Sequence, residues 1–379
     1  LGDVYKRQTV KAGKTEGTNM VSQGEQKDVE DTNTVITGKS DKNTVTIKAE
    51  NENDKVEVKL EDLNIDASSR GEAAVSVTGK GDTNIELDGD NELKSGRNRA
   101  GLEHNQTADS EGNVTSGKLT IQDDKDNAGS LTATGGEFAA GIGGGNANAG
   151  QVTITGGNIT ATGGYGSAGI GGGYGQISPN PNAGDGDVTI SGGTIKAAGG
   201  TFGAGIGGGY IGDAHVTITG DAVIEEAQGG IQSAGIGGGQ GADGDVEISG
   251  NARIDKVTGG DYGAGIGSGL GESGAPCNGK VTIKDNAKIG LAQGGFGAAG
   301  IGGGYYYSNG YDDDDSTSGV GDVTIEGNTT VNAVGGLGAA GIGNGVNAID
   351  FGGAAVNQIT IRGSEAGSPT VTATGGVSG

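Results

Sequence analysis

The sequence predicts an all-β chain folded as a parallel β-helix, a three-faced solenoid built from stacked glycine-rich repeats. The hexapeptide Ala-Gly-Ile-Gly-Gly-Gly, or a close variant, occurs seven times, and short segments of alternating apolar and polar residues lie between the copies. The chain has 87 glycines among 379 residues, and only 32% of its residues are hydrophobic. Such a composition cannot fill one thick core, whereas a solenoid needs only a thin core extended along one axis.

The hexapeptide defines one segment of each coil. Coils stacked in register would place its isoleucines in one inward ladder, with neighbouring coils about 4.8 Å apart. Glycine reaches positive φ without a Cβ penalty, so the triple glycines allow sharp corners. We expect Gly141 and Gly143 to face outward as a bare strip, and Arg99-Ala-Gly-Leu102 to be a degenerate earlier copy. The ladder consists of Ile142, Ile170, Ile206, Ile236, Ile266, Ile301 and Ile342.

Two further strands complete each coil. Val152–Ile154 and Ile159–Ala161 alternate with the period of two that is typical of half-buried strands. Glycine every few positions would destabilise a helix. A large side chain also occurs four or five residues before each hexapeptide isoleucine, and these side chains are expected to lie along one shared edge. They are Phe138, Tyr165, Phe202, Ile231, Tyr262, Phe296 and Leu337.

The chain divides into four parts. Residues 1–8 resemble a translated sequencing adapter and are interpreted as an assembly artefact. Residues 9–30 are mostly polar and are interpreted as a linker. We expect residues 31–134 to form irregular entry coils, and residues 135–379 to form regular coils truncated at the C-terminus.

The net charge of the chain argues against two classes of binding partner. With 24 Lys and Arg against 48 Asp and Glu, the formal net charge is −24. Nucleic acid phosphates and anionic membrane surfaces would be repelled, and no segment has the roughly 18 apolar residues of a membrane span. The single cysteine, Cys277, excludes an intrachain disulfide.

Two regions carry a resemblance to a known family. Val58-Lys-Leu-Glu-Asp-Leu-Asn-Ile-Asp66, Ile85–Gly96 and Arg99–Leu102 resemble the entry coils of clostridial cell-surface repeat proteins, and Leu131–Gly136 with the hexapeptide array resembles their repeats. Some members are similar to a calcium-binding right-handed β-helix that binds plant polysaccharides. The resemblance implies a right-handed solenoid, an extracellular location on a bacterial surface, a longer multi-domain chain and a polysaccharide or host glycan as partner.

The segments between each hexapeptide and the next strand vary most in length and sequence. Insertions gathered at one corner of a solenoid map to one side, often the binding side. The most distinctive segment is Tyr305-Tyr-Tyr-Ser-Asn-Gly-Tyr-Asp-Asp-Asp-Asp315, whose tyrosines suit stacking on sugar rings. The alternative is a polar loop that has drifted in sequence. The predicted glycan-binding residues are Tyr305, Tyr306, Tyr307, Tyr311, Tyr174 and Tyr210.

Aspartates recur just before the first strand of each coil. Like charges at one coil spacing repel unless water or a cation screens them, and Ca²⁺ prefers carboxylate oxygens. The sequence therefore allows weak Ca²⁺ binding along this edge, with solvated turns as the alternative and no cofactor required. The candidate ligands are Asp185, Asp187, Asp213, Asp243, Asp245, Asp312, Asp313, Asp314, Asp315 and Asp322.

No catalytic residues are assigned. The repeated Gly-Ile-Gly-Gly-Gly is not a dinucleotide-binding loop, since that motif needs a helix after it. Neither His104 nor His215 has an evident partner in the sequence. We therefore expect a non-catalytic surface module for carbohydrate binding or adhesion. A polysaccharide lyase-like β-helix enzyme and a purely structural spacer are the alternatives.

Overall fold

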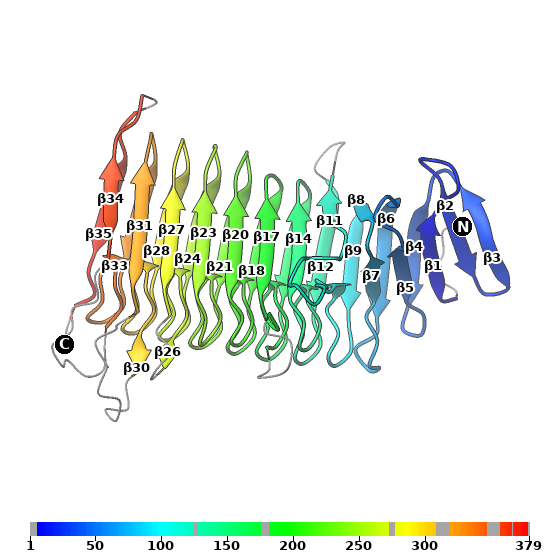
Figure 1. Cartoon of the computed structure of the whole chain (residues 1–379), viewed down its shortest axis with the longest axis horizontal. Coiled ribbons are helices and arrows are strands. Elements are labelled where there is room, and N and C mark those ends of the chain that lie inside the picture. Colours follow the sequence, from blue (N-terminus) through cyan, green and yellow to red (C-terminus); the bar gives the residue numbers. More distant parts are fainter. Residues whose placement is uncertain are drawn as a thin grey trace.

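A computed structural model describes residues 6–123, 128–175, 182–272, 277–307, 319–346, 357–365 and 367–377. In these residues the regular structure consists of strands alone, stacked side by side into an elongated solenoid (Figure 1). The N-terminal strands lie at one end of the stack and β35 lies at the other. The described part of the chain contains no helix that could span a membrane.

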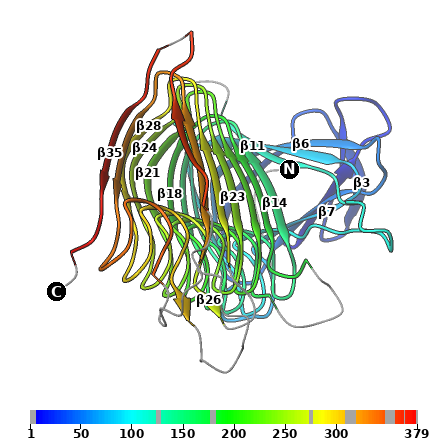
Figure 2. The same ribbon diagram turned by 60° about the vertical axis from the view of Figure 1, so that its left-hand side comes forward.

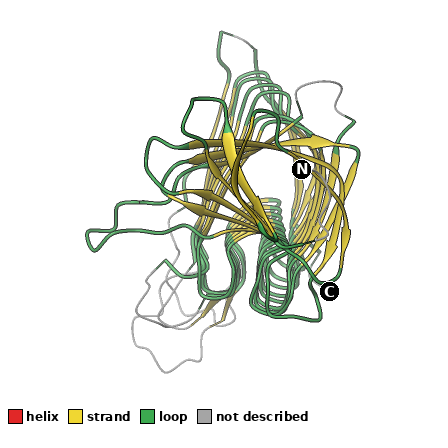
Figure 3. Ribbon diagram, turned by 90° about the vertical axis from the view of Figure 1, so that its right-hand side faces the viewer, coloured by secondary structure: helices red, strands yellow, loops and turns green. Residues whose placement is uncertain are grey.

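Each regular coil gives one strand to a 13-stranded sheet and two strands to a 20-stranded sheet. A view along the axis shows the coils lying one behind another (Figure 3). The strands of neighbouring regular coils pair in parallel. The 13-stranded sheet runs in the order β3 (Gln26–Asp31), β2 (Asn19–Gln23), β1 (Gln8–Ala12), β5 (Val45–Ala49), β7 (Val75–Gly79), β10 (Leu102–His104), β13 (Ile142–Gly143), β16 (Ile170–Gly171), β19 (Ile206–Gly207), β22 (Ile236–Gly237), β25 (Ile266–Gly267), β29 (Ile301–Gly302) and β33 (Ile342–Gly343).

The 20-stranded sheet consists of two parallel stacks that share the long strand β6 (Lys55–Asp66), which pairs with β4 (Val35–Ser40). Two of the three predicted faces are therefore joined into one sheet. The first stack holds β8 (Asp82–Asp88), β11 (Leu119–Gln122), β14 (Gly150–Ile154), β17 (Gly186–Ile190), β20 (Ala214–Ile218), β23 (Gly244–Ile248), β27 (Gly279–Ile283), β31 (Gly321–Glu326) and β34 (Ile359–Arg362). The second holds β9 (Asp90–Lys94), β12 (Ser130–Thr134), β15 (Asn158–Thr162), β18 (Thr194–Ala198), β21 (Val223–Gln228), β24 (Arg253–Thr258), β28 (Lys288–Gln293), β32 (Thr330–Val334) and β35 (Thr370–Thr374).

The predicted isoleucine ladder is confirmed. Each hexapeptide isoleucine pairs in register with the next, from Ile142 through Ile342, and all seven are buried. Leu102 of the degenerate copy pairs with Ile142, so it belongs to the same ladder. The alternating strands of the other sheet bury Val188 and Ile190 and their equivalents in the same way.

The glycines of the hexapeptide do not form the bare outward strip that the sequence predicted. Gly141 and Gly143 are buried, because the segment lies between two layers of backbone. A Cβ on Gly141 would lie 2.6 Å from the Thr162 nitrogen, and one on Gly143 would lie 2.2 Å from the Gly171 oxygen. Gly143 also has a φ of +126°, a region in which side chains are strained. These glycines therefore permit close backbone approach rather than exposure.

Residues 8–31 contain three strands, so the interpretation of residues 9–30 as a linker is wrong. Strands β1, β2 and β3 make an antiparallel meander whose first strand pairs in parallel with β5. The meander covers the first coil, and solenoids need such an end cap because an exposed sheet edge can pair with other chains. Gln8 is buried at the start of β1, inside the stretch interpreted as an artefact.

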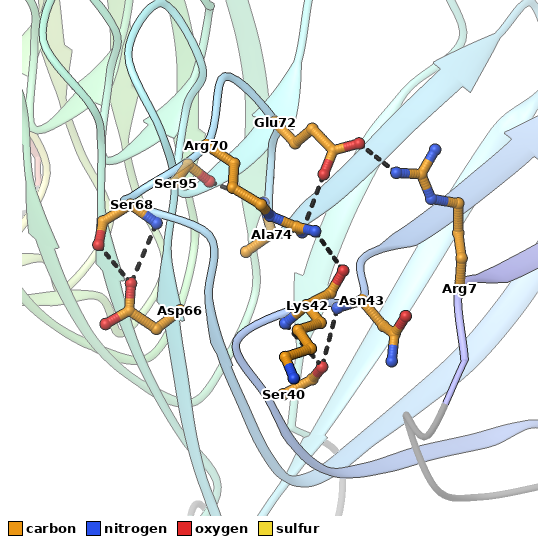
Figure 4. Close-up of polar contacts among 10 residues, drawn as sticks. All are labelled: Arg7, Ser40, Lys42, Asn43, Asp66, Ser68, Arg70, Glu72, Ala74 and Ser95. Atoms are coloured by element: carbon orange, nitrogen blue, oxygen red, sulfur yellow. Dashed lines mark hydrogen bonds and ion pairs between the residues drawn. The ribbon is translucent and has the colours of Figure 1, made fainter.

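Polar contacts fasten this end of the solenoid (Figure 4). Glu72 forms ion pairs with Arg70 (2.8 Å) and with Arg7. Arg70 also donates to the Lys42 carbonyl, which connects the turn after β6 to the turn before β5. Arg7 thus reaches from the residue before β1 to a neighbouring coil.

A test of the buried glycines follows from this geometry. Gly237 has a φ of +133°, and its Cβ would lie 1.9 Å from the Gly267 oxygen. At an unstrained position, replacing glycine by alanine stabilises a protein by up to about 1 kcal/mol. Gly237→Ala should instead destabilise this chain and lower its free energy of unfolding by more than about 1 kcal/mol. Gly71→Ala is the matched control, since no atom lies within 4 Å of its Cβ position. Equal melting temperatures for the two variants would contradict the buried role.

Candidate functional site

The large side chains before each hexapeptide do lie along one edge of the solenoid, and a second column joins them. The second column contains the fourth residue after each hexapeptide isoleucine from Ile170 onward, and in three coils its backbone nitrogen donates to a carbonyl of the first column. Tyr174 N donates to the Phe138 carbonyl (3.3 Å), and Tyr305 N donates to the Tyr262 carbonyl (2.9 Å). We call the two columns together the aromatic edge. Its members are Phe138, Tyr165, Phe202, Ile231, Tyr262, Phe296 and Leu337 in column one, and Tyr174, Tyr210, Gln240, Leu270, Tyr305 and Val346 in column two.

Rings on the aromatic edge contact one another from coil to coil. In column one, the Phe138, Tyr165 and Phe202 rings meet edge to face, with centroids 5.7 and 5.4 Å apart. In column two, the Tyr174 and Tyr210 rings are stacked, with centroids 5.0 Å apart and planes inclined by 14°. The prediction of a shared edge is thus confirmed for the aromatic members. These rings therefore bury part of their surface against one another, as other aromatic pairs do.

Several residues of column one are held in a strained backbone conformation. Phe138, Phe202 and Tyr262 have φ values of 71°, 93° and 72°, whereas the coils of Tyr165 and Phe296 place glycine at this position. A bulky residue at positive φ is a true outlier. Such strain persists only where the surrounding structure holds the residue in place, and strained residues are frequent at functional sites.

A pocket of about 400 Å³ opens in the aromatic edge around Leu270. Tyr305 and Tyr307 line it, and Tyr307 is 56% exposed. Strand β30 (Tyr306–Tyr307) carries Tyr307 and pairs with β26 (Gly271–Glu272), and both strands lie at the lower margin of the solenoid (Figures 1 and 2). The pocket is within the range of roughly 300–1,000 Å³ that ligand pockets occupy. Its lining residues are Gln232, Tyr262, Leu270, Phe296, Tyr305 and Tyr307.

The other predicted glycan-binding residues divide into three groups. Tyr174 and Tyr210 belong to the aromatic edge but lie three or more coils from Tyr305. Tyr306 is only 1% exposed, so the prediction that its ring contacts a glycan is wrong. Tyr311 and Asp312–Asp315 lie outside the described residues. Burial raises the pKa of the Tyr305 phenol, which keeps this hydroxyl neutral at the pocket.

The predicted aspartate edge exists, but its carboxylates bond to backbone. Asp185 Oδ1 accepts from Asp213 N (2.9 Å), Asp213 Oδ1 from Asp243 N (2.8 Å), and Asp243 Oδ1 from Asn278 N (2.6 Å). Each carboxylate therefore bonds to the turn of the next coil. Among the described residues, no group of three or more His, Cys, Asp or Glu side chains is placed to hold a metal ion.

The second line of aspartates is not a run of like charges. In register, Asp187 is followed by His215, Asp245, Lys280 and Asp322. Lys280 pairs with Asp245 (2.7 Å), and the exposed His215 ring lies 3.9 Å from the same carboxylate. Acidic and basic groups thus alternate along this line, which removes the repulsion on which the calcium prediction depended.

Both histidines have partners that the sequence did not reveal. His104 is buried, its Nδ1 lies 2.7 Å from the Gln151 carbonyl oxygen, and burial lowers its pKa. Its neighbour Glu103 occupies the position of a hexapeptide glycine and bonds to Arg99 (2.9 Å). Glu103 is also buried, which raises its pKa. The contact between His104 and Gln151 connects the degenerate coil to strand β14.

Sequence reasoning missed Leu270 and Gln232 as pocket residues. The only signal for Leu270 was its position, the fourth after a hexapeptide isoleucine, where three other coils carry Tyr174, Tyr210 and Tyr305. The sequence predicted that Tyr262 and Phe296 lie on the shared edge, but it did not predict a pocket there. The pocket depends on how these residues from three coils meet.

Asp185 provides a pH test of the aspartate edge. Desolvation raises the pKa of this carboxyl from 3.8 to about 6, so the folded chain holds its proton more tightly than the unfolded chain. The associated stability is complete at low pH and is lost as pH rises through 6. Asp185→Asn keeps an oxygen acceptor for Asp213 N. We expect melting temperatures measured from pH 7 down to pH 5 to rise less for the variant than for the parent chain. An identical pH profile would contradict the assignment.

A comparison with protein-family models agrees with the repeat architecture. A model described as a beta helix repeat matches residues 127–146, 152–174, 188–210, 216–240 and 323–346. Each match ends at or beyond the glycine hexapeptide, and the second ends at Tyr174 of column two. Comparisons with curated proteins and with solved structures give no significant match. The parallel stacking and the matched repeats together lead to one conclusion: the chain is a β-helix repeat protein.

Proposed function

We propose that this chain is a non-catalytic extracellular module that binds carbohydrate through the pocket in its aromatic edge. The observation that carries the proposal is the pocket itself, where four aromatic side chains from two neighbouring coils meet. Apolar ring faces beside phenolic hydroxyls suit a sugar, which has an apolar ring face and a rim of hydroxyl groups. Gln232 adds an amide with both a donor and an acceptor.

The mutual inclination of the rings supports this choice. Tyr262 and Phe296 meet at 75°, and Tyr305 is inclined to them by 48° and 57°. Inclined walls leave the pocket concave, whereas the stacked Tyr174 and Tyr210 cover one another. The strained φ of Tyr262 is consistent with a residue kept for its ring despite a backbone cost.

A lyase-like enzyme is the second candidate, and a different pocket favours it. About 540 Å³ of space on the entry coils is lined by Lys39, Asp62, Asp90 and Glu92 among other polar residues. Lysine is a possible base for the proton of an acidic sugar, and carboxylates are able to hold a metal that stabilises the product anion. Release of unsaturated products from polygalacturonate, and its loss in Lys39→Ala, would establish this activity.

The binding proposal predicts the effect of two tyrosines. Tyr305→Ala combined with Tyr307→Ala should weaken glycan binding by about tenfold or more, since a loss of about 1.4 kcal/mol is a factor of ten. Binding is measured by pull-down and by calorimetry on plant and host glycans. Tyr165→Ala is the matched control, because Tyr165 is also exposed on the aromatic edge but lies away from the pocket. Equal binding by all variants, with unchanged β-sheet circular dichroism, would place the site elsewhere.

A further inference from the structure

Column two carries a tyrosine ring in three coils and no ring in the others, and the coil of Ile266 is one that lacks a ring. The Tyr174–Tyr210 pair shows that the column holds parallel rings 5.0 Å apart, which is close to the usual spacing of stacked coils, about 4.8 Å. At the coil of Ile266, the residue in this column is Leu270. Its side chain is buried and too short to reach where a phenol ring would lie.

The pocket occupies the space beside Leu270 where other coils of column two place a ring. Leu270 is held one coil from Tyr305 by the bond from Gly271 N to the Tyr305 carbonyl (2.9 Å) and by the pairing of β26 with β30. Leu270 therefore forms the floor, and Tyr305 and Tyr307 form the wall on the next coil. Gln232, whose carbonyl accepts from Leu270 N (2.8 Å), lines the side of the preceding coil.

We propose that the slot above Leu270 takes a single pyranose ring of an uncharged glycan, in place of the ring that column two lacks at this coil. The inference rests on the proposed function and assigns its subsite. A six-membered sugar ring presents a flat apolar face to Tyr305, as one tyrosine of the column presents to the next. One coil of space admits one such ring.

Charge excludes acidic sugars from this slot. Among the described residues, no lysine or arginine lines the pocket, and the exposed Asp261 directly precedes Tyr262. A uronate carboxylate placed among these rings would lose water without gaining a partner. It would also meet the repulsion of a chain with a net charge of −24. Arg97, which lies 5.2 Å from the Phe138 ring, belongs to the coil of Leu102, five coils from that of Tyr262.

The proposal is tested by substitutions of Leu270 that fill the slot with a larger side chain. Leu270→Tyr supplies the missing ring, and Leu270→Phe is a second filling variant in case the first does not fold. Leu270→Ala is the matched control that leaves the slot open. Each chain is titrated against immobilised cellulose, xylan and mannan as uncharged probes, and against polygalacturonate and alginate as acidic probes. Circular dichroism and thermal melting report folding.

The expected result is that at least one uncharged polysaccharide binds the parent chain and acidic probes do not. Folded Leu270→Tyr or Leu270→Phe should lose at least tenfold in affinity, while Leu270→Ala retains most of it. Undiminished binding by a folded filling variant would overturn the subsite, as would preferential binding of the acidic probes, and either result leaves the proposed function standing. Absence of binding to every probe by the parent chain would overturn both.

Discussion

In-register parallel stacking of coils is the constraint on which the rest of the structure depends. Once Ile142 pairs with Ile170 and each later isoleucine pairs with the next, every position of the repeat becomes a column along the axis. A side chain then meets its own equivalents about 4.8 Å away. Packing, charge and binding are consequently properties of columns, and a single coil has none of them.

The columns differ in how they meet this constraint. The glycine columns of the hexapeptide leave no room for side chains, because each glycine contacts the backbone of the next coil. In the first stack of the 20-stranded sheet, the column that contains Asp245 alternates acidic and basic groups, and Asp245 forms an ion pair with Lys280 of the next coil. The turn before it uses carboxylates as acceptors for the next coil's backbone, at a cost in desolvation that raises the pKa of Asp185. The aromatic edge stacks its rings.

Departures from a column are where a repeat protein acquires individual chemistry. Leu270 stands in column two where three other coils carry tyrosine, and it leaves a pocket, whereas Glu103 stands in place of a hexapeptide glycine and forms an ion pair with Arg99. The difference lies in the surroundings. Glu103 is enclosed, so its charge needs a partner inside the protein. The space above Leu270 opens to solvent beside the exposed Tyr307, so a ligand is able to reach it.

The sequence by itself determined the parallel β-helix, the isoleucine ladder and the aromatic members of the edge, because each is written in residues that recur at one position of the repeat. Tertiary structure decided the rest. The cap of β1 to β3 lies outside the repeat, so its polar sequence resembled a linker. Gly143 faces backbone instead of water, and Asp187 lies beside His215 instead of another carboxylate. Both outcomes depend on which residues of the next coil lie beside these positions. The pocket depends on residues from three coils, and no single repeat contains it.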